Sequence, residues 1–395
     1  MVKLNPHFKE LKREYIYPII DQKLAELKKG HPGVKILNFG VGDIALPLAP
    51  SIAKAIICGV EEMTTEEGMR GYGPHNGYPF LREAIVKNEF SKLGIDADEI
   101  FVSDGTNSDT VNILDLFNLS SVVGVTNPTY PAYLDSTIIS GRKKILLFPC
   151  TAENHFAPQP PKEHCDLIYL CSPSNPTGVA MDRDALQKWV DYARREQSLL
   201  LMDSAYEAFI RSPDVPRTIF ELPGAKECAI EFRSFSKSAG FTGLRCAYAV
   251  LPKSVKAQLG RKTLSLHPYW DRRQATKFNG VAYPIQRGAE AVYTQEGRAE
   301  TGAQVALYLE QARRLKEGIK KCGFMCYGGM DSPFIWWKTP DGQSSWEFFD
   351  TLLKKFQLLC VPGRGFGEYG EGYVRLSAFT KPEITTLALE RLHQG

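Results

Sequence analysis

A lysine with potential phosphate-binding groups on both sides lies past the middle of the 395-residue sequence. Ser234, Ser236 and Lys237 belong to the run Ser-Phe-Ser-Lys, and Arg245 follows eight residues after the lysine. A neutral lysine amine can attack an aldehyde, while two hydroxyls and a guanidinium can bind a dianionic phosphate. Pyridoxal 5'-phosphate (PLP) carries both groups, so the cluster predicts PLP as cofactor and Lys237 as the catalytic residue. Taken alone, however, the run is more typical of an exposed strand end.

Three residues that precede this cluster in the sequence are candidates to bind the ring of the cofactor. Asp203 ends the apolar run LLLM, 34 residues before Lys237, and its carboxylate can keep the ring nitrogen N1 protonated. The ring can then take up the electrons left when the substrate Cα–H bond breaks. Tyr206 and Asn175 can both reach the 3-oxygen of the ring. The alternatives are an Asp that caps the next turn and an Asn in an ordinary Pro/Gly-rich turn.

Three further segments add candidate ligand-binding groups. The run 104–107, which includes Thr106 and Asn107, follows an apolar strand and opens a helix, where backbone N–H groups suit a phosphate. Tyr130 can stack on a flat ring, or it can be a core aromatic. Arg375 lies inside an apolar run, and its planar guanidinium matches an α-carboxylate. A buried arginine needs a partner, and we expect a ligand rather than a structural carboxylate.

These polar residues follow short apolar runs that alternate with amphipathic helices. We expect strands at 99–105, 121–128, 166–173, 198–206 and 229–237, and helices near 108–118, 131–140 and 182–196. Apolar strands alternating with helices predict an α/β fold with a mostly parallel sheet covered on both faces. Ligands of such sheets bind at the carboxyl ends of the strands, which is where the candidate residues occur.

The rest of the chain predicts a second, smaller α+β unit. After two long helical patterns over roughly 273–322, we expect a strand at 334–338, a helix around 345–356, two further strands and a final helix to 393. The helical pattern within 6–30 ends at Gly30, and the N-terminal segment that contains it has no sheet of its own. We therefore predict an N-terminal segment that packs with the small domain, a large PLP-binding domain and a small C-terminal domain, at 1–45, 46–285 and 286–395.

Composition argues against several classes of function. The net charge of +3 favours neither nucleic acid nor a membrane surface, and no apolar stretch approaches the about 20 residues of a membrane span. The N-terminal run MVKLNPHFKELKREY lacks an apolar signal region. The nine cysteines form no CxxC pair, which favours reduced thiols and no metal site. We expect a cytoplasmic enzyme with small-molecule amino acid and keto acid substrates.

The order of the candidate residues resembles that of the fold type I, class I/II PLP aminotransferases over nearly the whole chain: Asn175, Asp203, Tyr206, Lys237, Arg245 and Arg375. Stretches outside the shared PLP core narrow the resemblance to the LL-diaminopimelate aminotransferase family. These are the runs at 5–8, 71–73, 101–105, 130–135, 217–221, 240–243, 278–280 and 362–367.

The resemblance implies amino transfer between glutamate/2-oxoglutarate and LL-2,6-diaminopimelate/tetrahydrodipicolinate in lysine biosynthesis. It also implies a homodimer with shared active sites, in which Tyr72 reaches the cofactor phosphate of the other subunit. Substrate contacts are implied for Tyr15, Gly42, Glu67, Asn107, Tyr130, Asn175, Asn279 and Arg375. Among these, Glu67 would face the distal ammonium of the substrate, or it is simply a solvated loop charge.

Two positions depart from that family. It usually has a lysine where this chain has Asn107, and Gly-Asp-Thr-Thr where this chain has the run 42–45, Gly-Asp-Ile-Ala. The lost charge and hydroxyls concern recognition of the distal end of the substrate and leave the PLP chemistry unchanged. The alternatives are an aminotransferase for aromatic or other amino acids, a PLP-dependent C–S β-lyase, and a PLP-binding regulator.

Overall fold

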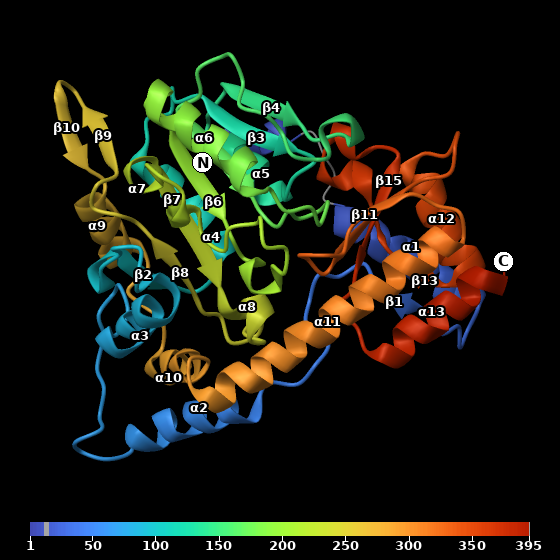
Figure 1. Ribbon diagram of the computed structural model, residues 1–395, viewed down its shortest axis with the longest axis horizontal. Coiled ribbons are helices and arrows are strands. Elements are labelled where there is room, and N and C mark those ends of the chain that lie inside the picture. The colour runs from blue at the N-terminus through green and yellow to red at the C-terminus, as the bar shows by residue number, and fades with distance from the viewer. Residues whose placement is uncertain (12–15, 395) are drawn as a thin grey trace.

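The computed structural model describes residues 1–11 and 16–394, which form two α/β parts joined by one long helix (Figure 1). A seven-stranded sheet is the centre of the larger part, in the order β2-β8-β7-β6-β5-β3-β4. Its strands are β2 (Ile100–Ser103), β3 (Val123–Asn127), β4 (Ile145–Pro149), β5 (Leu167–Cys171), β6 (Leu199–Asp203), β7 (Ala229–Ser234) and β8 (Ala247–Val250). Every pair from β7 to β4 is parallel, and β8 is antiparallel to both of its neighbours.

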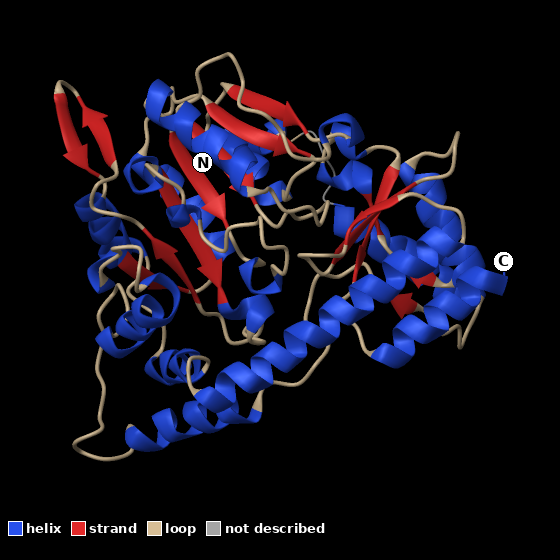
Figure 2. Ribbon diagram, in the orientation of Figure 1, coloured by secondary structure: helices blue, strands red, loops and turns tan. Residues whose placement is uncertain are grey.

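Helices cover both faces of this sheet (Figure 2). They are α2 (Pro50–Glu62), α3 (Pro79–Ile85), α4 (Thr106–Asn112), α5 (Pro131–Ile139), α6 (Arg183–Glu196), α7 (Ala225–Cys228), α8 (Phe235–Ser238), α9 (His267–Lys277) and α10 (Tyr283–Ala291). Every residue of β5 and β6 is buried, as expected for strands with helices on both sides. The predicted α/β fold with a mostly parallel sheet is confirmed.

Helix α6 illustrates why these segments are helical. The Asp182 side chain accepts from the N–H of Ala185 at 2.8 Å and so caps the first turn. Leu186, Trp189, Val190 and Ala193 recur at helical spacing and are buried against the sheet. The helix ends at Gln197, which has a left-handed backbone with φ 55°.

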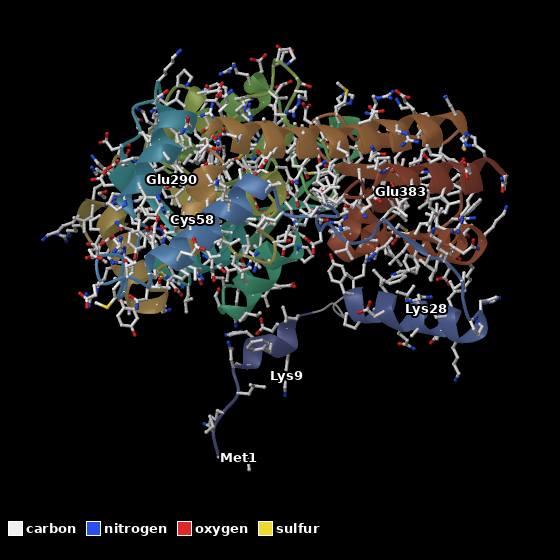
Figure 3. The ribbon with its side chains drawn as sticks, turned by 90° about the horizontal axis from the view of Figure 1, so that it is seen from below. Met1, Lys9, Lys28, Cys58, Glu290 and Glu383 are labelled. Atoms are coloured by element: carbon white, nitrogen blue, oxygen red, sulfur yellow. The ribbon has the colours of Figure 1, made fainter. Side chains whose placement is uncertain are left out.

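The smaller part contains an antiparallel sheet in the order β11-β12-β15-β14. Its elements are β11 (Cys326–Gly328), β12 (Phe334–Lys338), α12 (Ser345–Phe356), β13 (Leu358–Leu359), β14 (Val361–Pro362), β15 (Tyr373–Ser377) and α13 (Pro382–Gln394). N-terminal residues join this core: Ile16 and Ile20 of α1 (Ile16–Gly30) are buried in it, and β1 (Leu37–Asn38) pairs with β13. Figure 3 shows the Met1 end extending away from the body, whereas Asn5 donates to the carbonyl of Ile139 in α5 at 3.0 Å.

Helix α11 (Gln295–Lys321) runs from the larger part to the smaller one (Figure 1). Residue 285, where the sequence places a domain limit, lies inside α10, the helix just before α11. Ala289, later in α10, belongs to the core of the larger sheet. The domain limits drawn from the sequence remain a prediction. A hairpin of β9 (Lys256–Leu259) and β10 (Lys262–Ser265) projects from the larger part. Across residues 1–11 and 16–394, no helix combines the length and apolar character needed to span a bilayer.

Candidate active site

A cavity of about 420 Å³ lies at the carboxyl ends of β5, β6 and β7. It is lined by Tyr17, Val41, Gly42, Asp43, Thr106, Asn107, Tyr130, Tyr133, Cys171, Asn175, Asp203, Ala205, Tyr206, Ser234, Ser236, Lys237, Thr242, Arg245 and Arg375. Most of the residues that the sequence predicts for the site therefore meet in one place. The reason is that parallel strands end at the same edge of the sheet.

Lys237 stands in the short helix α8, directly after β7. Its amine donates to the backbone carbonyl of Gly42 at 2.5 Å. Burial lowers the pKa of this amine from the ordinary 10.5 to about 8, against the opposing charge of Asp43, and Arg375 and Arg245 lower it further. Near neutral pH, a much larger fraction of this amine is neutral than for an exposed lysine.

The end of the cavity near Arg245 suits an anion. The Ser234 hydroxyl accepts from the Ser236 N–H at 3.1 Å, and the Thr106 hydroxyl oxygen is buried without a hydrogen-bond partner among the described residues. A Cβ atom at Gly105 would lie 2.3 Å from Nη2 of Arg245, so only glycine lets the guanidinium approach the start of α4. Hydroxyls, a guanidinium and the first N–H groups of a helix together fit the phosphate of the predicted cofactor.

Asp203 lies at the floor of the cavity, with both carboxylate oxygens engaged. The Tyr133 phenol donates to Oδ2, and the Ala205 N–H donates to Oδ1 at 3.0 Å. Burial raises the pKa of the Asp203 carboxyl, and these two hydrogen bonds act in the opposite direction. From the sequence, the alternative role for Asp203 was to cap the next turn, and the contact with Ala205 is of that kind. Each carboxylate oxygen has a second lone pair, so this contact leaves the carboxylate able to accept from a ring N–H.

Tyr133 is a site residue that the sequence argument did not single out. Its ring is buried and stacks on Tyr169 with a centroid separation of 4.8 Å. The available signal was its position three residues after Tyr130, because residues three apart in a helix lie on the same face. At Tyr130 itself, the phenol donates to Oδ1 of Asn107 at 3.2 Å.

Arg375 is buried at 2% exposure between the rings of Phe334 and Phe366, whose centroids lie 4.7 and 4.8 Å from its guanidinium carbon. Nη1 donates to Oδ1 of Asn175 at 2.7 Å, and Nη2 donates to the carbonyl of Gly40 at 2.8 Å. Within the described residues, Nε has no hydrogen-bond partner and no carboxylate forms an ion pair with this arginine. The charge of a buried arginine without a protein carboxylate fits an anionic ligand.

Three of the predicted site residues do not line this cavity, and a fourth is outside the part of the chain that the structure describes. Tyr72 is 94% exposed, and Glu67 lies exposed in the loop between α2 and α3. Asn279 is exposed with φ 72°, next to Gly280, which lies against the backbone of Pro74. Tyr15 lies outside the described residues. The roles predicted for these four residues therefore stay predictions.

Asp43, Cys171, Tyr17, Val41, Ala205 and Thr242 also line the cavity without having been predicted. For Asp43 the available signal was its place directly after Gly42 in the sequence. Val41 and Ala205 are likewise neighbours of predicted residues in the sequence, whereas Tyr17, Cys171 and Thr242 are brought to this edge of the sheet by the fold.

Comparisons with known proteins give consistent matches. The sequence profile of the family "Aminotransferase class I and II" matches residues 34–392. The LL-diaminopimelate aminotransferases of Parabacteroides distasonis and Desulforapulum autotrophicum are each 46% identical, over 100% of this chain and 99% of theirs. The solved L,L-diaminopimelate aminotransferase from Chlamydomonas reinhardtii superposes with a TM-score of 0.94 at 38% identity, covering 100% of this chain and 98% of that one. A Thermus thermophilus aspartate aminotransferase, at 20% identity and a TM-score of 0.87, shares the fold.

Proposed function

The chain belongs to the class I and II aminotransferases, which are PLP-dependent, and on this premise we propose that its substrate pair includes diaminopimelate. The reaction would exchange an amino group between glutamate/2-oxoglutarate and LL-2,6-diaminopimelate/tetrahydrodipicolinate, a step of lysine biosynthesis. The observation that carries the proposal is 46% identity, over essentially the full length, to enzymes named LL-diaminopimelate aminotransferase. The cavity supports it with a lysine, a carboxylate and a carboxylate-binding arginine in one site.

Residues of this cavity suit the binding of PLP. When bound, the cofactor supplies an aldehyde that reacts with amino groups and a protonated ring that accepts negative charge from the substrate Cα. Asp203 would hold the proton on the ring nitrogen, whose positive charge would in turn lower the carboxyl pKa that burial raises. Tyr206 and Asn175 would contact the 3-oxygen. The phosphate would be bound by Thr106, Ser234, Ser236 and Arg245, with Asn107 and Tyr130 beside them.

Two residues would act on the substrate directly. Arg375 would hold the α-carboxylate, since its guanidinium is buried in the cavity wall without an ion pair to a described residue. Lys237 would remove the proton from the substrate Cα as general base and deliver it to the cofactor carbon that carries the aldehyde. Its depressed pKa of about 8 suits this role, because the neutral amine is the base.

The proposal includes a homodimer with shared active sites. The single chain exposes Tyr72 together with apolar side chains of α2 and the loop that follows it, namely Ile57, Val60, Met63 and Met69. A group of exposed apolar residues of this kind is typical of an interface between subunits. In a dimer, Tyr72 would reach the cofactor phosphate of the neighbouring site, and Glu67 and Asn279 would reach its substrate. A cytoplasmic location is also proposed, supported by nine free thiols, most of them buried.

The experiment is a panel of amino donors with 2-oxoglutarate, including the LL, meso and DD stereoisomers of diaminopimelate. We expect glutamate to be formed from the LL isomer, and only when the keto acid is present. A C–S β-lyase would release pyruvate and ammonia from a cysteine conjugate without any keto acid, and a regulator would do neither. Efficient turnover of aromatic amino acids without diaminopimelate turnover would refute the proposed substrate while leaving the aminotransferase assignment in place.

A further inference from the structure

One face of α11 carries three side chains that hold the segment 45–51. The carboxylate of Glu300 accepts from the N–H of Ser51 at 3.0 Å and from its hydroxyl at 2.6 Å. One turn later, the side-chain nitrogen of Gln304 donates to the carbonyl of Pro47 at 2.9 Å. After another turn, the Tyr308 phenol oxygen lies 3.0 Å from two backbone nitrogens, those of Ala45 and Leu46. Residues four apart in a helix lie on the same face, so the three contacts form one row.

The segment 45–51 follows directly after a stretch of chain that lines the cavity. Gly42 accepts from Lys237, and Gly40 accepts from Arg375 at 2.8 Å. Asp43 lines the cavity and acts on the Lys237 amine through its charge. Residues 40–43 therefore contact or electrostatically influence the two side chains that would act on the substrate, Lys237 and Arg375.

Tyr308 itself does not line the cavity, and its ring is 1% exposed. It packs in a small cluster with Tyr206, Phe334 and Phe379. Its ring lies edge-to-face on Phe379 with a centroid separation of 4.9 Å. Phe334 lies under the guanidinium of Arg375, and a Cβ atom at Gly42 would lie 3.3 Å from the same ring. The phenol is thus one layer behind the substrate-binding groups.

We infer that Tyr308 is a positioning residue of the active site, acting through its phenol oxygen on the main chain of residues 40–46. This inference rests on the proposed aminotransferase reaction but not on the identity of the amino donor. Loss of the oxygen would leave the part-buried N–H groups of Ala45 and Leu46 without their acceptor, which is costly to the extent that water does not replace it. The segment would then relax, and the carbonyl of Gly40 that orients Arg375 would move with it.

The test is Tyr308→Phe in the PLP-loaded enzyme, assayed by the exchange of a carbon label from 2-oxoglutarate into glutamate, because amino transfer between these two molecules gives no net product. We expect KM for glutamate to rise about tenfold, because the oriented Arg375 binds the carboxylate in both ground and transition states. The value of kcat should change less than about threefold, and the visible absorption of the bound cofactor should not change. In the cofactor-free protein, hydrogen exchange at the amides of residues 43–48 should become faster.

A matched control is Tyr192→Phe. The Tyr192 phenol also accepts a buried backbone N–H, that of Cys165 at 3.1 Å, and it donates to the carbonyl of Glu163 at 2.6 Å. It lies outside the cavity, so its loss should lower stability without raising KM. Gln304→Ala removes the neighbouring contact of the row at a partly exposed site. We expect it to raise KM in the same direction but by a smaller factor.

Three outcomes would overturn the inference. One is an unchanged KM in Tyr308→Phe, whether or not amide exchange changes, and another is an equal rise of KM in Tyr192→Phe. If Tyr308→Phe does not fold, Gln304→Ala becomes the deciding variant. The third contradicting outcome is then an unchanged KM and unchanged amide exchange at residues 43–48 in Gln304→Ala. Failure of the diaminopimelate proposal is a separate result, because it would appear in the wild-type donor panel while the glutamate measurements still report on Tyr308.

Discussion

Nη1 of Arg375 lies 2.7 Å from Oδ1 of Asn175. The two residues are 200 positions apart, one on β15 of the small sheet and the other in the loop after β5 of the large sheet. Because Asn175 accepts through its oxygen, its amide nitrogen is the group that can donate to a ligand. The contact joins a residue proposed to bind the substrate to one proposed to bind the cofactor, across the junction of the two parts.

Arg375→Lys should lower kcat/KM for every amino acid substrate by about 10- to 100-fold. Lysine keeps the charge but loses the planar pair of donors that matches a carboxylate. The measurement is steady-state kinetics with glutamate and diaminopimelate. Arg391→Lys is the control, since its guanidinium donates to the surface carbonyls of Lys35 and Phe356, and it should leave kcat/KM unchanged. Equal kinetics for the two variants would contradict the role given to Arg375.

Lys237→Ala should abolish turnover while part of the cofactor stays bound. Binding would persist because Asp203, Ser234, Ser236 and Arg245 remain in the cavity wall. Visible absorption after dialysis measures the retained cofactor, and the donor panel measures turnover. Near-normal turnover in this variant would contradict the central assignment.

Asp43→Asn should lower the pKa of Lys237 still further. The negative charge of Asp43 favours the protonated amine and so raises a pKa that burial brings down to about 8. Without that charge, we expect a fall of about half a unit. In the cofactor-free protein, labelling of Lys237 by an amine-reactive reagent at a series of pH values, read by mass spectrometry, gives the midpoint. A midpoint that stays or moves to higher pH would show that Asp43 does not act on this amine.

Asp203→Asn should reduce kcat by about 100-fold with a much smaller change in KM. Asparagine preserves size but removes the charge that keeps the ring nitrogen protonated, and it replaces one of the two accepting oxygens with a donor. The interaction strengthens as electrons enter the ring, so its loss affects the transition state more than substrate binding. A change confined to KM would rule out the electron-sink role of Asp203.

Glu67→Gln tests recognition of the distal ammonium of diaminopimelate. A charge-assisted contact contributes about 1.5–3 kcal/mol, so diaminopimelate turnover should slow by one to two orders of magnitude, roughly, while the glutamate half-reaction is spared. Glu66→Gln is the control in the same loop. Equal losses for both substrates in Glu67→Gln would instead indicate a structural role for Glu67.

Asn107→Lys should improve binding of the distal carboxylate if that group lies nearby.

Much of the fold follows from local patterns in the sequence. The helix expected at 345–356 is α12 (Ser345–Phe356), and the strand expected at 334–338 is β12 (Phe334–Lys338). Both are predictable because apolar periodicity and helix caps act over a few neighbouring residues. The helix expected at 108–118 instead begins at Thr106 and gives way to a 3-10 turn at Ile113, because element ends depend on what packs against them. Helices α2 and α3 and strand β8 were not predicted.

The sequence by itself determined the chemistry of the site, because Lys237, Asp203 and Arg375 are recognisable by residue type and order. Only the tertiary structure decided which groups surround them. Tyr133 meets Asp203 across 70 residues, and Tyr308 meets Ala45 across 263. No local period encodes such contacts, since they arise where separate layers pack together. Tyr72, Glu67 and Asn279 are exposed on the single chain. Packing within one chain therefore does not decide their roles, which stay predictions.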